Sequence, residues 1–169
     1  HDPLTGLANR ALFTDRLQQA LAAAHRDHTQ VALLFLDLDN FKPVNDQYGH
    51  AMGDELLKVA ASRMQGCLRD SDTVARIGGD EFVLLLRSLG APASHTALAV
   101  AEKIRTALSQ PFELAGHALQ ISCSIGVALY PDHALDDIAL AHHADQAMYQ
   151  AKLAGRNRVV LCESPVQDA

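Results

Sequence analysis

One apolar segment, residues 31–38, restricts the folds open to this chain more than any other feature. It has the sequence Val-Ala-Leu-Leu-Phe-Leu-Asp-Leu, so no polar side chain interrupts it before Asp37. An uninterrupted and partly β-branched run of this length is typical of a strand that is buried on both faces. The segment therefore predicts a central strand in a covered sheet.

Helical and strand patterns alternate along the rest of the chain. A turn-rich segment at 2–10 precedes a helical stripe of apolar residues. Helical spacing recurs over 54–68, 94–108 and 136–154, and residues 39–49 are predicted to form a turn or a short helix. Strands are predicted at 73–77, 81–86, 111–114, 119–129 and 159–161, with hairpin turns at 78–80 and near Gly116. Paired strands separated by helices favour an α+β fold, a sheet with helices packed on it.

The charge balance limits the partners. Lys and Arg number 14 against 20 Asp and Glu, which gives a net charge of −6 at pH 7. An acidic surface argues against nucleic acid and anionic membranes as partners. A few local cations can still hold a small phosphate ligand.

The length of 169 residues suits one domain, which we expect to span 2–161, with 162–169 as a tail or linker. Because the chain begins with His1 and not with Met, we expect it to be a fragment of a longer protein. Its three cysteines are far apart and form no CxxC pair, which favours the reducing cytoplasm. No apolar run approaches the length of a membrane helix, which is about 20 residues. Missing segments of the full-length protein could still supply a membrane anchor.

Two acidic residues follow one another closely at the end of the predicted central strand. Asp37 and Asp39 are two residues apart, so they share a face of an ideal strand. Neighbouring carboxylates repel unless a positive charge lies between them, and Mg²⁺ accepts such oxygen ligands. A strand-end aspartate that caps the next turn explains the same pattern.

Residues 78–82 have the sequence Gly-Gly-Asp-Glu-Phe, directly after Ile77. The two glycines allow a tight turn and the close approach of a ligand to the backbone. Asp80 and Glu81 then point to opposite faces if the chain is extended, so one of them can reach a metal. An ordinary hairpin turn has the same composition.

Two further segments could bind a nucleotide. Asn45 and Asp54 flank a loop-like stretch, and a carboxylate there can accept from N1–H and the amino group of guanine. Asp54 could instead cap a following helix. Lys152 and Arg156 are four apart near a predicted helix end and could clamp a triphosphate, or simply complement the helix dipole.

Together and in this order, these segments resemble the GGDEF family of diguanylate cyclases. Residues 78–82 carry its signature unbroken, and residues 2–10 resemble the family's turn Asp-x-Leu-Thr-x-Leu-x-Asn-Arg. The similarity extends from about Asp2 to about Leu161. It implies the palm fold of cyclases and polymerases, a ferredoxin-like core whose central, mostly antiparallel sheet of about five strands is surrounded by helices.

The resemblance also implies a metal site and catalytic groups. Asp37, Glu81 and the carbonyl group of Leu38 would hold Mg²⁺ or Mn²⁺, with two ions per active site. Asp80 is placed to help deprotonate the attacking hydroxyl group. Asp80, Glu81 and Lys42 are thus the expected catalytic residues.

Substrate contacts follow from the same resemblance. Asn45 and Asp54 match the residues that recognise guanine, and Phe41 would border the triphosphate. The expected phosphate contacts are Lys42, Lys152 and Arg156. Asp39 is expected to be metal-adjacent or structural.

Residues 69–72 have the sequence Arg-Asp-Ser-Asp and match the family's RxxD inhibitory site, at the expected distance before Gly78. Arg69 and Asp72 would bind the product, cyclic di-GMP, and hold the domain in unproductive assemblies. A charged loop that ends a helix is the simpler alternative.

The implied reaction condenses two GTP molecules into cyclic di-GMP and releases pyrophosphate. Each chain offers one guanine site, and the resemblance implies two chains facing each other, so we expect catalysis in a homodimer and weak activity of the isolated fragment. A region before Asp2 would supply dimerisation and sensing, and a C-terminal phosphodiesterase domain is a further candidate partner. Two alternatives stay open: a non-enzymatic regulatory module that binds GTP or cyclic di-GMP, and a product receptor that acts through Arg69 and Asp72.

Overall fold

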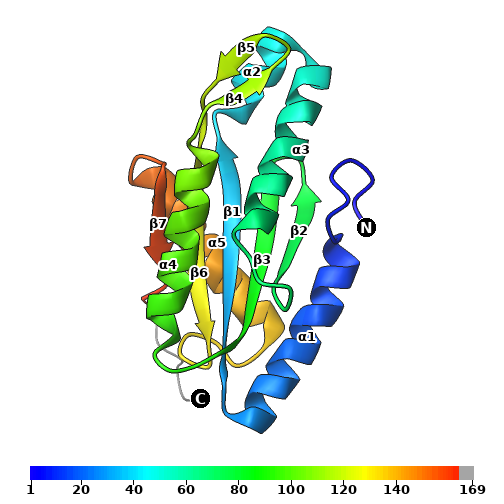
Figure 1. Cartoon of the computed structure of the whole chain (residues 1–169). Helices are drawn as coiled ribbons and strands as arrows, with labels where there is room; N and C mark the ends of the chain where they lie inside the picture. Colours follow the sequence, from blue (N-terminus) through cyan, green and yellow to red (C-terminus); the bar gives the residue numbers. More distant parts are fainter. Residues whose placement is uncertain (164–169) are drawn as a thin grey trace.

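Five strands form a central sheet with helices on both faces (Figure 1). The computed structural model describes residues 1–163. The sheet has the strand order β2-β3-β1-β6-β7, and only β6 and β7 run parallel. Its strands are β1 (Gln30–Asp39), β2 (Thr73–Gly78), β3 (Glu81–Leu89), β6 (Ser122–Tyr130) and β7 (Arg158–Leu161). The helices are α1 (Arg10–Asp27), α2 (Phe41–Tyr48), α3 (His50–Gly66), α4 (Ala93–Leu108) and α5 (Asp137–Leu153). The predicted α+β, palm-like fold with a mostly antiparallel sheet of five strands is confirmed.

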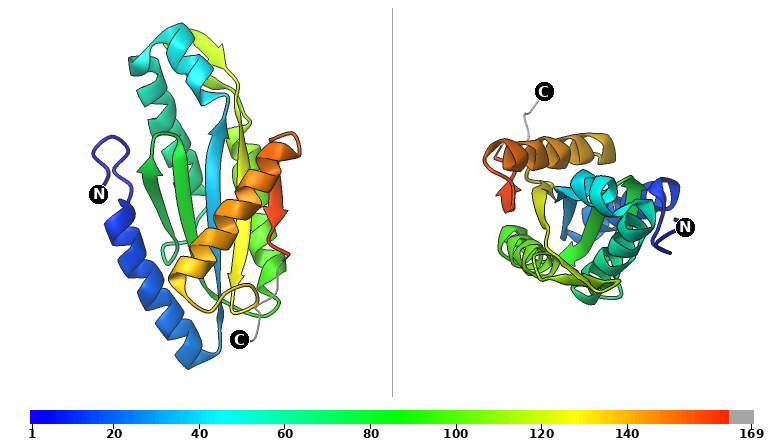
Figure 2. Two further views of the ribbon diagram at one scale, coloured as in Figure 1. Left: turned by 180° about the vertical axis from the view of Figure 1, so that it is seen from behind. Right: turned by 90° about the horizontal axis from the view of Figure 1, so that it is seen from above.

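The central strand β1 is buried on both faces, as its apolar run predicts. Leu34 and Leu36 belong to a core cluster that contains side chains of α3 and α4. Val31 and Leu33 belong to a second cluster, with side chains of α1 and α5. Figure 2 shows α1 and α5 on one side of the sheet and α3 and α4 on the other. Because side chains alternate along a strand, successive residues of one run fill two cores.

The region after α4 differs from the prediction of one long strand over 119–129 that pairs with 111–114. Instead, β4 (Phe112–Leu114) pairs with the short strand β5 (His117–Leu119), and the chain enters the central sheet only at Ser122. Ser122 pairs with Asp39, the last residue of β1. Residues before Ser122 therefore have no partner on β1, and Leu119 and Ile121 are buried in the core without belonging to that sheet.

The helix α3 begins four residues earlier than predicted, at His50. Gly49, with φ of +90°, separates it from the short helix α2, which is confirmed. Asp54 therefore lies inside α3, and the interpretation of Asp54 as a helix cap is wrong. Side-chain caps occur elsewhere: Asn9 accepts a hydrogen bond from the amide of Leu12, and Asp136 from that of Ala139.

The N-terminal turn is fastened to the hairpin between β2 and β3. The carboxylate of Asp2 accepts hydrogen bonds from the amide and the hydroxyl group of Thr5, at 2.8 and 2.6 Å. Arg76 donates from Nη1 to Asp2 (3.2 Å) and from Nε to the carbonyl of Gly79 (2.8 Å). Burial alone would raise the pKa of Asp2, but the Thr5 hydrogen bonds and Arg76 lower it below its usual value. Arg76 thus joins the turn to the signature hairpin, a role that the sequence did not indicate.

Among residues 1–163, no helix is both long and apolar enough to cross a membrane. The domain bounds of 2–161 stay a prediction. Cys162 is buried and donates its amide to the carbonyl of Val127 at 2.7 Å. Most of the predicted tail, 164–169, lies outside the described residues.

Candidate active site

Two carboxylates lie opposite each other on neighbouring strands at one end of the sheet. Asp37 of β1 is in register with Glu81 of β3, and directly opposite residues in an antiparallel pair have Cβ atoms about 5 Å apart. Asp80 lies with Gly79 in the two-residue turn between β2 and β3, and its carbonyl accepts the amide of Leu38 at 3.2 Å. The hairpin therefore brings both acids of the signature to the end of the central strand, which we call the acidic corner (Asp37, Asp80 and Glu81).

Burial at the acidic corner raises the pKa of Asp37 to about 7. Burial is the main cause, the charge of Asp80 and then Glu81 add to it, and Lys152 opposes it. Carboxylates held this close favour a cation between them. Two carboxylates and the Leu38 carbonyl are oxygen donors of the kind that Mg²⁺ and Mn²⁺ prefer, so these residues fit such an ion.

The protein side chains alone do not complete a metal cage. Within residues 1–163, no group of three or more His, Cys, Asp or Glu side chains is arranged to hold an ion. Mg²⁺ commonly keeps several water ligands and binds through one or two carboxylates together with substrate phosphates. Asp37, Glu81 and the Leu38 carbonyl would thus supply only some of the ligands of such an ion.

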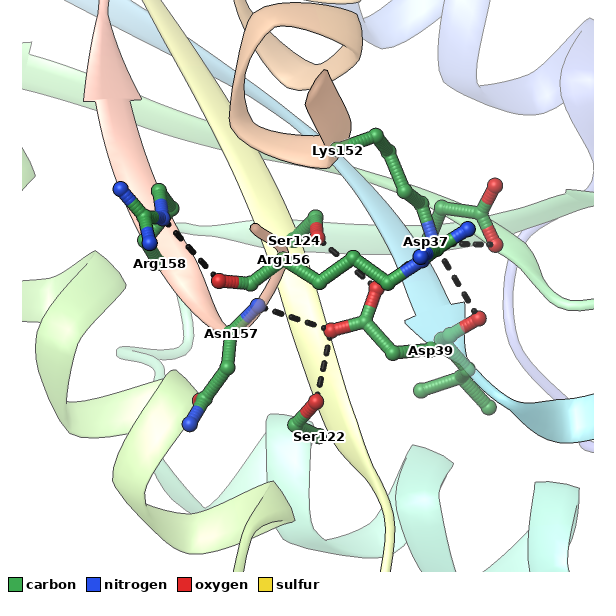
Figure 3. Close-up of polar contacts among 9 residues, drawn as sticks. Asp37, Asp39, Ser122, Ser124, Lys152, Arg156, Asn157 and Arg158 are labelled. Carbon is green, nitrogen blue, oxygen red and sulfur yellow. Dashed lines mark hydrogen bonds and ion pairs between the residues drawn. The ribbon is translucent and has the colours of Figure 1, made fainter. Parts of the chain in front are cut away.

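Lys152 reaches the acidic corner from the end of α5. Its Nζ lies 2.7 Å from Oδ1 of Asp39, 3.7 Å from Oδ1 of Asp37 and 3.4 Å from the Leu38 carbonyl (Figure 3). The contact of one ammonium group with both aspartates confirms that Asp37 and Asp39 share a face of β1, the face covered by α5.

The carboxylate of Asp39 is enclosed by hydrogen-bonding groups of the protein itself. Its side chain is fully buried and accepts hydrogen bonds from the hydroxyl groups of Ser122 and Ser124, the amide of Asn157 and the ammonium group of Lys152 (Figure 3). Burial opposes its ionisation, but these hydrogen bonds outweigh burial and hold the pKa of Asp39 below its usual value. Sequence reasoning missed the two serines. Two small polar residues at alternate positions of an apolar strand were the available signal.

Arg156 does not lie on the helix with Lys152, so the argument from four-residue helical spacing is wrong. The helix α5 ends at Leu153, and Gly155, Arg156 and Asn157 have φ of +118°, +64° and +48°. This turn connects α5 to β7, and Arg156 within it is exposed. Of the other expected phosphate contacts, Lys42 is the second residue of α2 and is exposed.

Asn45 packs against Gly53 where α2 meets α3. Within residues 1–163, Oδ1 of Asn45 is the one buried side-chain polar atom without a hydrogen-bond partner. A Cβ atom on Gly53 would lie 1.7 Å from this oxygen and 3.2 Å from the ring of Phe41. A buried acceptor without a partner is costly unless a ligand supplies the donor. Asp54, the residue after Gly53, is exposed, so the expected guanine-binding pair flanks a glycine that the sequence did not single out.

The substitution Gly53→Ala is expected to lower GTP affinity about tenfold, the cost of one displaced hydrogen bond. The added methyl group must push away the amide of Asn45, which can rotate, so the fold should persist. Titration calorimetry with GTP and with ATP measures the effect, and the preference for GTP should fall with it. Gly66→Ala in the same helix is the control, because nothing lies within 4 Å of its Cβ position. Equal GTP affinity of Gly53→Ala and the parent would contradict the guanine site.

Arg69 and Asp72 line a separate cavity of about 250 Å³ beside the N-terminal turn. Nη2 of Arg69 lies 3.2 Å from Oδ1 of Asp72 and donates to the Arg87 carbonyl at 2.8 Å. Arg16 of α1 lines the same cavity and donates to the hydroxyl group of Thr73 at 3.4 Å. Sequence reasoning missed Arg16, since only the packing of α1 on β2 brings it to this cavity.

The fold and the site first define the class of protein, which is a palm-like α+β domain with an acidic corner at the end of its central strand. Residues 1–158 match the family model described as "Diguanylate cyclase, GGDEF domain". The chain belongs to the GGDEF family.

Individual relatives agree with this assignment. The chain is 49% identical over 164 residues to MucR of Pseudomonas aeruginosa, a bifunctional diguanylate cyclase/cyclic di-GMP phosphodiesterase, covering 97% of this chain and 24% of MucR. The solved GGDEF domain of TpbB from the same organism has a TM-score of 0.93 at 47% identity, covering 96% of this chain and 94% of that chain. The GGDEF domain of DgcB from Caulobacter crescentus, solved in complex with c-di-GMP, has a TM-score of 0.87 at 33% identity, with 96% and 93% covered. The chain therefore spans about a quarter of the length of MucR.

Proposed function

We propose that this chain is a catalytically competent diguanylate cyclase domain that condenses two GTP molecules into cyclic di-GMP and releases pyrophosphate. The observation that carries the proposal is the cross-strand pair of Asp37 and Glu81 beside an unbroken Gly-Gly-Asp-Glu-Phe hairpin. Membership of the GGDEF family and the cyclase names of MucR and TpbB support it.

The acidic corner performs the chemistry in this proposal. Asp37, Glu81 and the Leu38 carbonyl would hold Mg²⁺ or Mn²⁺, two ions per active site. When bound, the metal would neutralise charge on the phosphates and favour ionisation of the attacking hydroxyl group. Asp80, in the adjoining turn, accepts the proton of that 3′-hydroxyl group.

The surrounding residues orient the nucleotide. Asn45 and Asp54 bind the guanine edge and so select GTP over ATP, because adenine lacks the matching pair of donors. Phe41 borders the triphosphate. The phosphates are bound by Lys42, Lys152 and Arg156. Holding the reacting groups in line supplies much of the rate acceleration.

Mass spectrometry of the product formed from GTP and Mg²⁺ tests the proposal, with the protein dimerised by an appended coiled coil. Cyclic di-GMP together with pyrophosphate is the expected result. GTP binding without product would identify a non-enzymatic regulatory module, and binding of cyclic di-GMP alone would identify a product receptor.

Turnover per chain is expected to rise with protein concentration. Each chain offers one GTP site, and the two reacting GTP molecules must come from two apposed chains in a homodimer. The initial rate measured over a dilution series should therefore increase more than linearly until dimers saturate. A strictly linear rate from a monomer would contradict the dimeric mechanism.

The proposed partners are parts of a longer protein: a sensory or dimerisation region and a phosphodiesterase domain. The proposed location of this domain is the cytoplasm.

Arg69→Ala is expected to weaken product inhibition at least about tenfold, because Arg69 would supply charged hydrogen bonds to a phosphate of cyclic di-GMP. The concentration of cyclic di-GMP that halves the initial rate measures the effect. Arg26→Ala serves as control, since Arg26 is an exposed arginine of α1 that does not line the cavity. Coinciding inhibition curves of Arg69→Ala and the parent would rule out the RxxD site.

A further inference from the structure

A buried aspartate that the proposed reaction does not use lies behind the acidic corner. Asp39 ends β1, two residues after Asp37, and its side chain is fully buried. Burial of a carboxylate is unfavourable unless hydrogen bonds and a counter-charge satisfy it. The groups that form hydrogen bonds with Asp39 therefore indicate its role.

Three neutral donors surround Asp39 and hold it in one orientation. The hydroxyl groups of Ser122 and Ser124 donate to Oδ2 at 2.7 Å and to Oδ1 at 2.8 Å, and the amide of Asn157 donates to Oδ2 at 3.0 Å (Figure 3). Both serines lie on β6, where Ser122 is in register with Asp39 and Ser124 with Asp37. One more donor, Lys152, completes two hydrogen bonds to each carboxylate oxygen.

The turn that carries Asn157 is itself held in place. Arg156 and Asn157 both have positive φ, a conformation that is uncommon for non-glycine residues, although asparagine adopts it more readily than most. Nη1 of Arg105 on α4 donates to Oδ1 of Asn157 at 2.9 Å, while Glu102 pairs with the same guanidinium group at 2.9 Å. The contact with Arg105 of α4 fixes the side chain of Asn157, and so helps to keep its backbone N–H directed at Asp39.

Lys152 is the one charged group that Asp39 contacts by hydrogen bond in the described chain. A lysine side chain is flexible and its ammonium group has three donors. Asp39 binds one donor at 2.7 Å and keeps Nζ 3.4 Å from the Leu38 carbonyl, beside Asp37. Hydrogen bonds to Asp39 and the Leu38 carbonyl use two of the three donors, which leaves the third for the phosphates of the proposed function.

We propose that Asp39 is a positioning residue that, through its cradle of Ser122, Ser124 and Asn157, fixes the ammonium group of Lys152 for the nucleotide phosphates. The inference rests on the proposed phosphate contact of Lys152. Asp39 does not touch the nucleotide; it reduces the freedom that Lys152 would otherwise lose on binding.

A double-mutant cycle tests this inference. The affinity for 3′-deoxy-GTP, which lacks the attacking hydroxyl group, is measured with Mg²⁺ for the parent, Asp39→Asn, Lys152→Met and the double variant. Asp39→Asn should weaken binding about tenfold in the parent, the size of one charged hydrogen bond, and have no further effect in Lys152→Met. Asp145→Asn, an exposed aspartate on the same helix as Lys152, should change nothing.

The possible results separate the inference from the function on which it rests. Asp39→Asn could lower the affinity equally in the parent and in Lys152→Met, or leave the affinity of the parent unchanged. Either result would overturn the positioning role and leave the cyclase proposal untouched. Unchanged affinity of Lys152→Met would refute the phosphate contact itself, and the positioning role with it. If Asp39→Asn does not fold, as judged by circular dichroism, Ser124→Ala enters the same cycle, because it keeps both charges and removes one hydrogen bond of the cradle. A smaller loss of affinity that vanishes in Lys152→Met supports the inference, and any other pattern refutes it.

Discussion

Glu81→Gln is expected to reduce synthesis of cyclic di-GMP by roughly 1,000-fold or more, since bound metal contributes several kcal/mol to such reactions. Glutamine has nearly the shape of glutamate but lacks its charge, and Glu81 lies directly opposite Asp37 at the acidic corner. In the variant, Asp37 is the one carboxylate of this pair that is left to bind the ion. Release of pyrophosphate and mass spectrometry of the product measure the loss.

The same variant should remain folded. Burial, Asp80 and Glu81 together raise the pKa of Asp37 to about 7, so at alkaline pH the ionised Asp37 is repelled by its neighbours. Removing the charge of Glu81 relieves part of this repulsion, and the free energy of unfolding at alkaline pH should not fall. Glu113→Gln, an exposed glutamate of β4, is the matched control for both measurements. Normal synthesis by Glu81→Gln would remove the metal assignment.

Gly126→Ala is expected to lower the free energy of unfolding by about 3 kcal/mol or more, the upper range for overpacking. Gly126 of β6 lies directly beneath α5, and a Cβ atom there would lie 2.1 Å from the carbonyl oxygen of Ala144 and 2.2 Å from the amide nitrogen of Met148. Both are backbone atoms, so no side-chain rotation relieves the overlap and α5 must shift as a unit. Denaturant unfolding of the parent and the variant measures the difference.

A displaced α5 would also move Lys152 away from Asp39, so the folded fraction of Gly126→Ala should bind GTP more weakly. Gly66→Ala is the control for stability, because Gly66 lies in a helix, without positive φ, and its Cβ position is open. That control should be neutral or slightly stabilising, since alanine loses less backbone entropy than glycine on folding. Equal stability of Gly126→Ala and the parent would show that α5 and β6 are not in close contact in solution.

Features that depend on neighbouring residues were predictable from the sequence. The apolar run at 31–38 predicted β1 and its burial on both faces. The two glycines of the signature predicted the turn between β2 and β3, and Gly79 indeed has φ of +35°. Each of these features is encoded within a few consecutive residues, because backbone preference and side-chain alternation are local properties.

Other local patterns were misleading because tertiary contacts outweighed them. Residues 119–129 look like one apolar strand, but β1 ends at Asp39 and leaves nothing for the first of them to pair with. Lys152 and Arg156 have helical spacing, but α5 ends between them. The length of β1 decided where β6 begins, and the packing at the end of α5 decided where that helix stops.

The amino-acid sequence by itself determined the α+β fold, the signature hairpin and the acidic residues at the end of the central strand. Only the tertiary structure revealed that Asp39 belongs to a buried network with Ser122 and Ser124, 83 and 85 residues away, and with Asn157 and Lys152. It likewise decided that Arg16 joins Arg69 in one cavity and that Asn45 depends on Gly53. Such contacts depend on strand register and on how helices pack across the sheet, and neither is encoded in the residues adjacent to those that meet.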